Sequence, residues 1–387
     1  MYRQRRYLAE LVRRGWEVDL VSTPVNYLTG ETPARYARRL HTRETIEGIT
    51  HHWVRAPSGI HSSKSRRMLN YVGFAIAAGT VSAALRRPDL IYVSSPPLPV
   101  ANVGTLLARR FRRPYVLEVR DIWPESAVAV GWLSAESRAY RTLERASRWS
   151  MRAAAGVVVP TPGLVDDVKR HGARRVEVVT GAVRDTEAPQ VVRAATRLGL
   201  GIPPDRRLFV YVGAVGVANG LDLLLDAIEQ LPHDVPASVV IAGDGSDRRN
   251  IEDRLRRQPL PNVILLPPAE PARALELLAA ADVCLHVLAP SQLFTGALPN
   301  KILDYLGAHR PFITTTPGLP ETIARESGGG FAPTVEALAA ELERWSRLQD
   351  GELAAQNAAA FAYGIERFGF QQNVDRLETL FRECSRE

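Results

Sequence analysis

Residues 294–311, FTGALPNKILDYLGAHRP, lie in the last third of the chain and predict a short polar loop followed by a helix over 300–309. The first backbone N–H groups of a helix lack partners within it and carry a partial positive charge, so they can hold a diphosphate. Lys301 adds a full charge in the first turn, and Asp304 can accept hydrogen bonds from a ribose diol. The stretch favours a nucleotide-sugar site, with an ordinary capped helix of an α/β domain as an equal alternative.

On both sides of this stretch, short β-branched runs alternate with helical segments. The strands predicted in the first half are 17–22, 52–56, 90–95, 115–120, 156–160 and 176–180. Those of the second half are 208–215, 238–243, 262–266, 283–288 and 311–316. Such alternation predicts an α/β protein with parallel, doubly wound sheets. We expect two Rossmann-like domains that face a cleft, with ligands at the carboxyl ends of the strands.

The length of 387 residues fits two domains of ordinary size. Residues 186–206 lack a strand pattern and contain three prolines, so they are predicted to be a linker. The first domain is then 1–185 and the second is 207–365. We expect the final helix, 366–387, to pack back on the first domain.

The first domain opens with a helix instead of the usual strand. Tyr7, Leu8, Leu11 and Val12 share one helical face, and the strand predicted at 17–22 follows directly. We therefore expect the first, central strand of this sheet to be missing. A misplaced start, a truncated copy, and another element in the gap are the three alternatives.

Composition limits the class of protein. A hydrophobic content of 45% and a charged content of 24% are typical of a soluble globular protein. Cys284 and Cys384 lie far apart, which favours a reducing compartment over a disulfide framework. We see no long apolar run and no signal-peptide pattern. These features predict a cytoplasmic protein.

The net charge of +7 is concentrated near the beginning of the chain. Residues 1–70 hold 13 Lys and Arg against 6 Asp and Glu, and the remaining residues are balanced. Lys64, Arg66 and Arg67 precede an apolar helix without acidic residues, as in interfacial helices on anionic lipid. We expect a peripheral membrane contact there; a solvated basic face or a buried helix are the alternatives. No nucleic-acid-binding motif is present.

Glycine-rich loops end two strands of the second domain. In YVGAVGVANGL, Gly213 and Gly216 let the backbone approach a bound group, and Asn219 lies at the helix start. Gly243 ends the next strand within IAGDG. One such turn is a weak signal. Three loops, at Gly213, Gly243 and Leu298, meet one sheet edge and together indicate a binding site.

The first domain has one unusual loop, EVRDIWPES, at the end of the strand predicted at 115–120. Asp121 and Glu125 would lie at the carboxyl end of that strand and face the cleft. Carboxylates at such a strand end are candidate acid or base groups. A salt-bridged strand exit is the structural alternative.

The segments NYLTGE, YVSSPPL, EVRDIWPES, GAVGVANGLDLLLDA, IAGDG and LPNKILDYL, in this order, resemble the bacterial family 4 retaining glycosyltransferases of the GT-B fold. The fucosamine-transferase-like group of surface-polysaccharide assembly is the most similar. The resemblance implies transfer of a hexose-type unit, such as an N-acetylated amino sugar, from a UDP-sugar to a lipid-linked or saccharide acceptor. A polyprenyl-diphosphate-linked sugar is the acceptor that such a group implies.

The resemblance also implies that domain 1–185 binds the acceptor and domain 207–365 the donor nucleotide. Asp121 or Glu125 is then the candidate catalytic residue that orients the acceptor hydroxyl. The second carboxylate of the family's E-x7-E pattern falls at Asp304, which should hold the ribose. The first falls at Gly296, so the backbone of the loop before the helix would have to hold the sugar. The donor-binding set is Gly213, Gly216, Asn219, Gly243, Thr295, Gly296, Ala297, Leu298, Asn300, Lys301 and Asp304. The acceptor- or membrane-facing set is Asn26, Tyr27, Lys64, Arg66 and Arg67.

The family's Arg and Lys after the first strand of the second domain fall near Ala214 and Asn219, so Lys301 would carry more of the diphosphate charge. The chain contains no Asp-x-Asp motif, and we therefore expect no metal and no other cofactor. A GT-B-fold nucleotide-sugar 2-epimerase and a non-catalytic sugar-nucleotide-binding subunit are the two alternatives.

Overall fold

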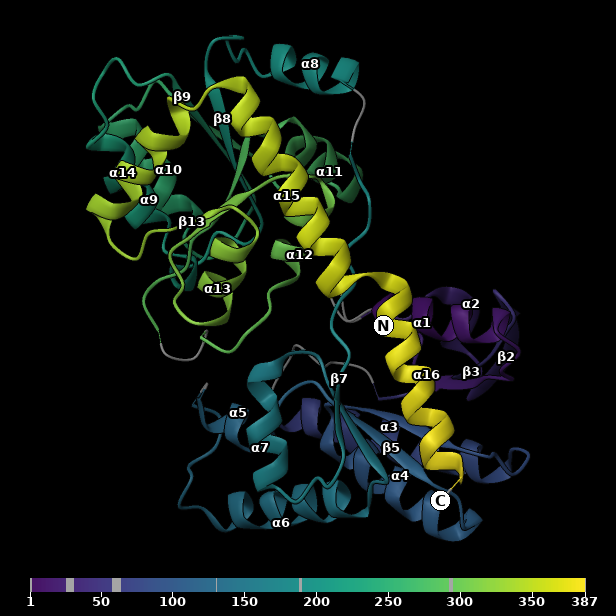
Figure 1. The fold of residues 1–387 in the computed structure, drawn as a ribbon. Helices are drawn as coiled ribbons and strands as arrows, with labels where there is room; N and C mark the ends of the chain where they lie inside the picture. The colour runs from purple at the N-terminus through teal and green to yellow at the C-terminus, as the bar shows by residue number, and fades with distance from the viewer. Residues whose placement is uncertain are drawn as a thin grey trace. The chain divides into compact units, whose positions relative to one another are not determined.

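The computed structural model of the chain describes residues 2–25, 31–57, 64–129, 131–187, 190–291 and 295–386 (Figure 1). It divides into two compact units. Unit 1 comprises Met1–Thr180 and Gln371–Glu387, and unit 2 comprises Gly181–Phe370. Each unit is built on parallel strands with helices between them, so the predicted α/β fold with two Rossmann-like domains is confirmed.

Unit 2 contains one six-stranded parallel sheet, in the order β10-β9-β8-β11-β12-β13. Its strands are β8 (Arg207–Val212), β9 (Ala237–Ala242), β10 (Val263–Leu266), β11 (Val283–His286), β12 (Phe312–Thr314) and β13 (Gly330–Phe331). Every residue of β9 and of β11 is buried. Continuous apolar strands of this kind form because helices cover both faces of a parallel sheet.

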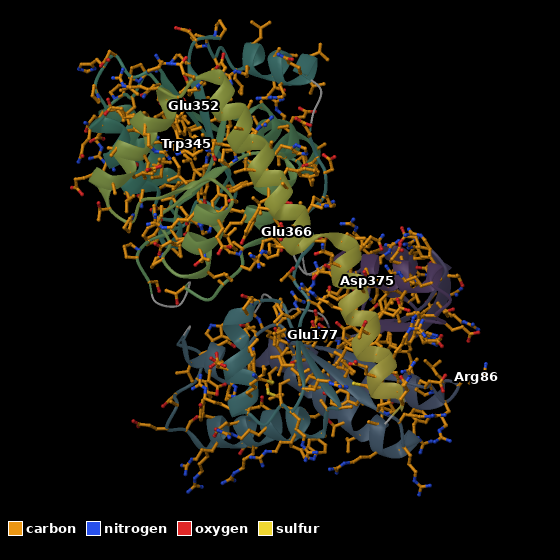
Figure 2. All side chains as sticks on the ribbon, in the orientation of Figure 1. Arg86, Glu177, Trp345, Glu352, Glu366 and Asp375 are labelled. Atoms are coloured by element: carbon orange, nitrogen blue, oxygen red, sulfur yellow. The ribbon has the colours of Figure 1, made fainter. Side chains whose placement is uncertain are left out.

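The helices of unit 2 form two layers. They are α8 (Gln190–Gly199), η2 (Val217–Asn219), α9 (Leu221–Glu229), α10 (Arg248–Arg257), α11 (Pro271–Ala280), α12 (Asn300–Gly307), α13 (Leu319–Glu326), α14 (Val335–Ser346) and α15 (Asp350–Phe368). Alternate residues of β8 enter the two cores. Phe209 packs with α9 and with Trp345 of α14 (labelled in Figure 2), whereas Leu208 packs with α11 and α12.

The segment predicted as a linker, 186–206, contains helix α8, and the boundary between the units lies at Thr180–Gly181. Helix α8 packs on α11. Its Arg197 donates to the buried Asp282 at 2.9 Å, and Asp282 also accepts from the backbone N–H of Leu208 at 2.8 Å. This buried ion pair ties α8 to the central strand, because a buried carboxylate needs its partners.

Unit 1 holds two separate sheets, ordered β1-β3-β2 and β4-β5-β6-β7. Their strands are β1 (Asp19–Ser22), β2 (His41–Ile46), β3 (Ile49–Val54), β4 (Ile91–Ser95), β5 (Tyr115–Val119), β6 (Gly156–Val159) and β7 (Val176–Val178). Strand β2 was not predicted, and it pairs antiparallel with β3. Glu47 and Gly48, with φ of 55° and 77°, form the tight turn between them.

Within the described ranges, β1 pairs only with β3 and β4 only with β5. No described strand therefore occupies the position where the sequence predicted a missing first strand. Glu118 of β5 is fully buried and accepts hydrogen bonds from Arg3 and Gln4 of α1 (Tyr2–Arg13).

The remaining helices of unit 1 are α2 (Ala34–Ala37), α3 (Lys64–Ala84), α4 (Leu98–Phe111), α5 (Glu125–Ala129), α6 (Arg138–Ala153), η1 (Pro162–Leu164), α7 (Val165–Arg170) and α16 (Phe370–Arg386). The last of these, α16, packs on unit 1. The ring of Phe381 lies edge-on to Trp16 at 5.8 Å and to Tyr92 at 5.1 Å. Asp375, labelled in Figure 2, accepts from Arg14 at 2.6 Å.

In the part of the chain that the structure describes, no helix combines the length and the apolar character needed to cross a lipid bilayer.

Candidate functional site

Two glycine-rich loops press against each other at the carboxyl edge of the unit 2 sheet. Gly213, after β8, donates its N–H to the carbonyl of Ala242 at 2.9 Å. A Cβ at Gly243 would lie 1.8 Å from the carbonyl oxygen of Gly213, and one at Gly245 would lie 2.3 Å from that of Val215. These positions accept only glycine. The backbone of both loops is therefore held in one fixed arrangement.

Lys301 of α12 reaches across this edge. Its Nζ lies 3.0 Å from the Tyr211 hydroxyl and 4.1 Å from the centre of the Tyr211 ring. A Cβ at Gly213, where φ is 146°, would lie 2.4 Å from the same Nζ. The structure thus brings together Lys301 and Gly213, two of the residues predicted to bind the donor. The hydroxyl of Tyr211 in turn donates to the carbonyl of Ala214 at 2.5 Å.

Lys301 is largely buried, and it forms no ion pair with a carboxylate among the residues that the structure describes. Burial lowers the pKa of Lys301 to about 8. Burial and the charge of Lys301 together lower the pKa of His286, at the end of β11, to about 3. His286 is therefore neutral, and its Nδ1 lies 2.9 Å from the Thr314 hydroxyl. A cationic group enclosed in this way is a site where a bound anion would restore the missing partner.

Asp304 lies one turn after Lys301 on the same helix and is partly exposed. Burial raises its pKa, and Arg184, whose guanidinium lies 4.0 Å away, offsets part of that rise. Arg184 was not among the predicted site residues. It lies far from Asp304 in the sequence, and no local pattern relates the two.

The loop before α12 is joined to the start of α13. The carbonyl of Thr295 accepts from the N–H of Leu319 at 2.7 Å, and Gly318, with φ of 82°, makes this approach possible. The neighbouring Thr316 is 3% exposed, and its hydroxyl has no hydrogen-bond partner in the described part of the chain. Thr316, which the sequence analysis did not single out, is a further polar group at this edge.

Two other predicted donor residues have structural partners. The side-chain oxygen of Asn219 accepts from the N–H of Gly216 at 3.1 Å, which closes the loop after β8 on itself. Asn300 is exposed at the start of α12. A missed residue, Arg248, donates to the carbonyls of Gly243 and Leu266 and so links the ends of β9 and β10.

In unit 1, the two candidate carboxylates lie in different surroundings. Asp121 is exposed just after β5; partial burial raises its pKa, and the charge of Arg120 offsets part of that rise. Glu125 accepts from Nε2 of His171 at 2.9 Å. Burial acts to raise the pKa of Glu125, but the hydrogen bond from His171 and other contacts outweigh it and lower the pKa. Asp121 is thus the carboxylate left open for a ligand.

The membrane- or acceptor-facing candidates are described only in part. Asn26, Tyr27 and the side chain of Lys64 lie outside the described residues. Arg66 is exposed at the start of α3, and the guanidinium of Arg67 lies 4.4 Å from the ring centre of Trp132.

Among the residues that the structure describes, no group of three or more His, Cys, Asp or Glu side chains is placed to hold a metal ion. Both cysteines are free and buried.

Unit 2 is a doubly wound, Rossmann-like domain with a cation and glycine loops at the carboxyl edge of its sheet, the edge where ligands bind in such folds. The fold of the whole chain is that of GT-B glycosyltransferases. The Anabaena protein HepE, solved in complex with UDP, matches it with a TM-score of 0.65 and 18% identity, over 82% of this chain and 84% of that one.

Two family models match in tandem. Residues 2–182 match the glycosyl transferase 4-like domain, and residues 206–347 match glycosyl transferases group 1. Both models are of glycosyltransferases, and together they cover most of the chain.

Two curated relatives agree with this assignment. The putative colanic acid biosynthesis glycosyl transferase WcaI of Escherichia coli is 23% identical over 78% of this chain and 76% of its own length. The probable glycosyltransferase WbjE of Pseudomonas aeruginosa is 27% identical over 79% and 76%. The finer assignment to the fucosamine-transferase-like group stays a prediction.

Proposed function

We propose that this glycosyltransferase moves a hexose-type sugar from a UDP-sugar to a lipid-linked or saccharide acceptor in surface-polysaccharide assembly. The buried charge of Lys301 beside Gly213 is the observation that carries the proposal. The UDP complex of HepE and the colanic acid role in the name of the Escherichia coli relative support the donor and the pathway class.

The diphosphate would lie against Lys301 and the first turn of α12, with the ribose at Asp304. As the bond between the sugar C1 and the diphosphate oxygen breaks, negative charge grows on the leaving group. Lys301 and the helix N–H groups stabilise that charge, a contribution of about 2–4 kcal/mol for one comparable donor. We propose that no metal ion is needed for this step.

We further propose transfer with retention. The acceptor hydroxyl attacks C1 from the face that the diphosphate leaves, a bond forms between C1 and the acceptor oxygen, and the leaving phosphate takes the hydroxyl proton. Asp121 would orient the hydroxyl by accepting its hydrogen bond. Because Gly296 has no side chain, the backbone of 295–298 and the Thr316 hydroxyl would hold the sugar.

A thermal-shift screen against UDP, GDP, ADP, dTDP and CMP, with and without EDTA, tests the donor site. A ligand at 100 times its Kd stabilises the folded state by about 2.7 kcal/mol, which is a clear shift. We expect a shift with UDP that EDTA leaves unchanged. A shift abolished by EDTA would refute metal independence, and no shift with any nucleotide would refute the donor site.

Substitutions of Asp304 and Asp121 should affect different steps, UDP binding in the first case and turnover in the second. Asp304→Ala is expected to weaken UDP binding by about tenfold, because a ribose hydrogen bond to a charged group is lost. Asp121→Asn is expected to keep UDP binding and to lose most of the acceptor-dependent UDP release. Calorimetry with UDP and a UDP-release assay measure the two effects.

Normal binding and turnover in both variants would contradict the site. Turnover without acceptor that changes only the sugar would identify the 2-epimerase alternative. UDP binding without any turnover would identify the non-catalytic subunit, which Gly296 in place of the family's first carboxylate favours.

A further inference from the structure

Helices α3, α4 and α6 form one layer on unit 1 (Figure 1). Helix α3 packs closely on α4, since a Cβ at Gly79 would lie 2.8 Å from Val103. Helix α4 packs on α6 through Asn102, whose amide donates to the Ser150 hydroxyl at 2.7 Å and to the carbonyl of Ala146 at 3.0 Å.

This layer is strongly basic. Its three helices contain ten Lys and Arg residues and a single Glu, whereas the rest of the chain contains 39 Lys and Arg against 41 Asp and Glu. The strongest concentration is on α6. Its arginines recur every three or four residues and share one face, opposite the buried Ser147, Ser150 and Met151.

The arginines of α6 point into solvent. Arg138, Arg141, Arg145 and Arg152 are exposed. In the described ranges the first three of them form no ion pair, while Arg148 pairs with Glu144 at 2.8 Å. Figure 2 shows a further arginine, Arg86, projecting just beyond the end of α3.

On the other side of α4, helix α3 exposes a stripe of apolar side chains. Leu69 is 61% exposed, Val72 is 39% exposed and Ile76 is 63% exposed, at the spacing of one helical face. Leu106 on the neighbouring α4 is 56% exposed. No acidic residue occurs in α3 or α4. A helix face of this kind is unfavourable in water and favourable at the boundary between lipid head groups and acyl chains.

We propose that the outer side of the α3–α4–α6 layer docks on an anionic lipid bilayer. The arginines would lie among the phosphate head groups, and the stripe on α3 would enter the acyl boundary. Nucleic acid would satisfy the arginines but not the apolar stripe. A second copy of the chain would bring two strongly positive surfaces together, which is unfavourable.

The proposed docking surface lies near Asp121, the residue that we propose to orient the acceptor. Met68 and Tyr71 of α3 line a small apolar pocket together with Pro97, Leu98 and Trp123. Trp123 is two residues from Asp121. This part of the inference rests on the proposed function, because a lipid-linked acceptor held in the membrane would then approach Asp121 along the pocket.

Sedimentation of the full chain with phosphatidylcholine vesicles, with and without phosphatidylglycerol, tests the docking surface. We expect sedimentation only with the anionic vesicles. The triple variant R138Q/R141Q/R145Q should bind on the order of a hundredfold more weakly, at about fivefold for each arginine. The matched control is R249Q/R256Q/R257Q, which removes three exposed arginines from α10 of unit 2 and should bind as the wild type does.

The double variant L69S/I76S tests the apolar stripe. It should weaken binding by about tenfold and lose the fraction that persists at high salt, because salt screens only the arginine contacts. Both positions are exposed, so the fold should tolerate the changes. The UDP thermal shift of every variant, measured in parallel, should equal that of the wild type.

Three outcomes would overturn the inference: no binding to anionic vesicles, an equal loss in the α10 control, or binding to RNA that is tighter than to vesicles and insensitive to L69S/I76S. The UDP shift keeps the two proposals apart. Vesicle binding without a UDP shift would refute only the donor site, and a UDP shift without vesicle binding would refute only the membrane surface.

Discussion

Lys301→Met is expected to stabilise the free protein and to abolish its UDP-dependent thermal shift. Burial lowers the pKa of Lys301 from 10.5 to about 8, so the charged form of this side chain destabilises the folded state. At 1.36 kcal/mol per pKa unit the penalty is about 3 kcal/mol. Loss of the contacts with Tyr211 offsets part of the gain, and a net stabilisation of about 1–2 kcal/mol should remain.

The stabilisation by Lys301→Met should decrease as the pH rises. Between pH 8 and 10.5 the unfolded lysine holds a proton that the folded one has lost, so wild-type stability rises with pH there. The advantage of Lys301→Met is therefore complete below about pH 8 and shrinks as the pH rises toward 10. Thermal unfolding of both proteins at pH 6.5 and 9.5 measures this change.

Lys169→Met is the matched control, because Lys169 is exposed on α7 and its removal should change stability by less than about 0.5 kcal/mol. In the UDP titration, Lys301→Met should lose about 2–3 kcal/mol of binding free energy, the usual size of a charge-assisted contact. A variant that is less stable and still binds UDP would show that Lys301 is only a structural partner of Tyr211.

Gly243→Ala is expected to be the most destabilising single-methyl change in unit 2. The added Cβ would lie 1.8 Å from the carbonyl oxygen of Gly213, so the ends of β8 and β9, which pair in the sheet, would have to separate. Overpacking of this kind costs about 3 kcal/mol. The UDP shift should be lost as well, since the displaced Gly213 lies beside Lys301.

Gly351→Ala controls for the methyl group itself. Gly351 lies in the first turn of α15, and nothing is within 4 Å of its Cβ position. Alanine there should be neutral or stabilising by up to about 1 kcal/mol. Calorimetric unfolding of the full chain compares the two variants, and equal transition temperatures would contradict the described contact between the two loops.

The sequence predicted most of the parallel strands because each is a short β-branched run bounded by turn residues. It did not predict β2, whose residues alternate between exposed and partly buried without an apolar face. Helix α8 was assigned to a linker because prolines flank it. The ion pair with Asp282 that orders it comes from a distant part of the chain.

The sequence predicted those parts of the site whose residues are close together in the chain. Lys301 and Asp304 stand one turn apart on a helix whose start the sequence marks clearly. Lys301 contacts Tyr211, and Glu125 contacts His171. Both contacts join distant segments, so no spacing of residues in the sequence predicts them. The arginine face of α6 is visible in the sequence at helical spacing, but its place beside the apolar stripe of α3 requires the packed layer.

The two units differ in how their sequence is arranged along the chain. Unit 2 is continuous, whereas unit 1 is completed by α16 from the end of the chain. During synthesis at about 5–20 residues per second, the first 180 residues would leave the ribosome on the order of 10–40 s before α16 does. Trp16 and Tyr92, which pack on Phe381, would stay uncovered for that time. Unit 1 can therefore complete its native packing only after α16 has been made.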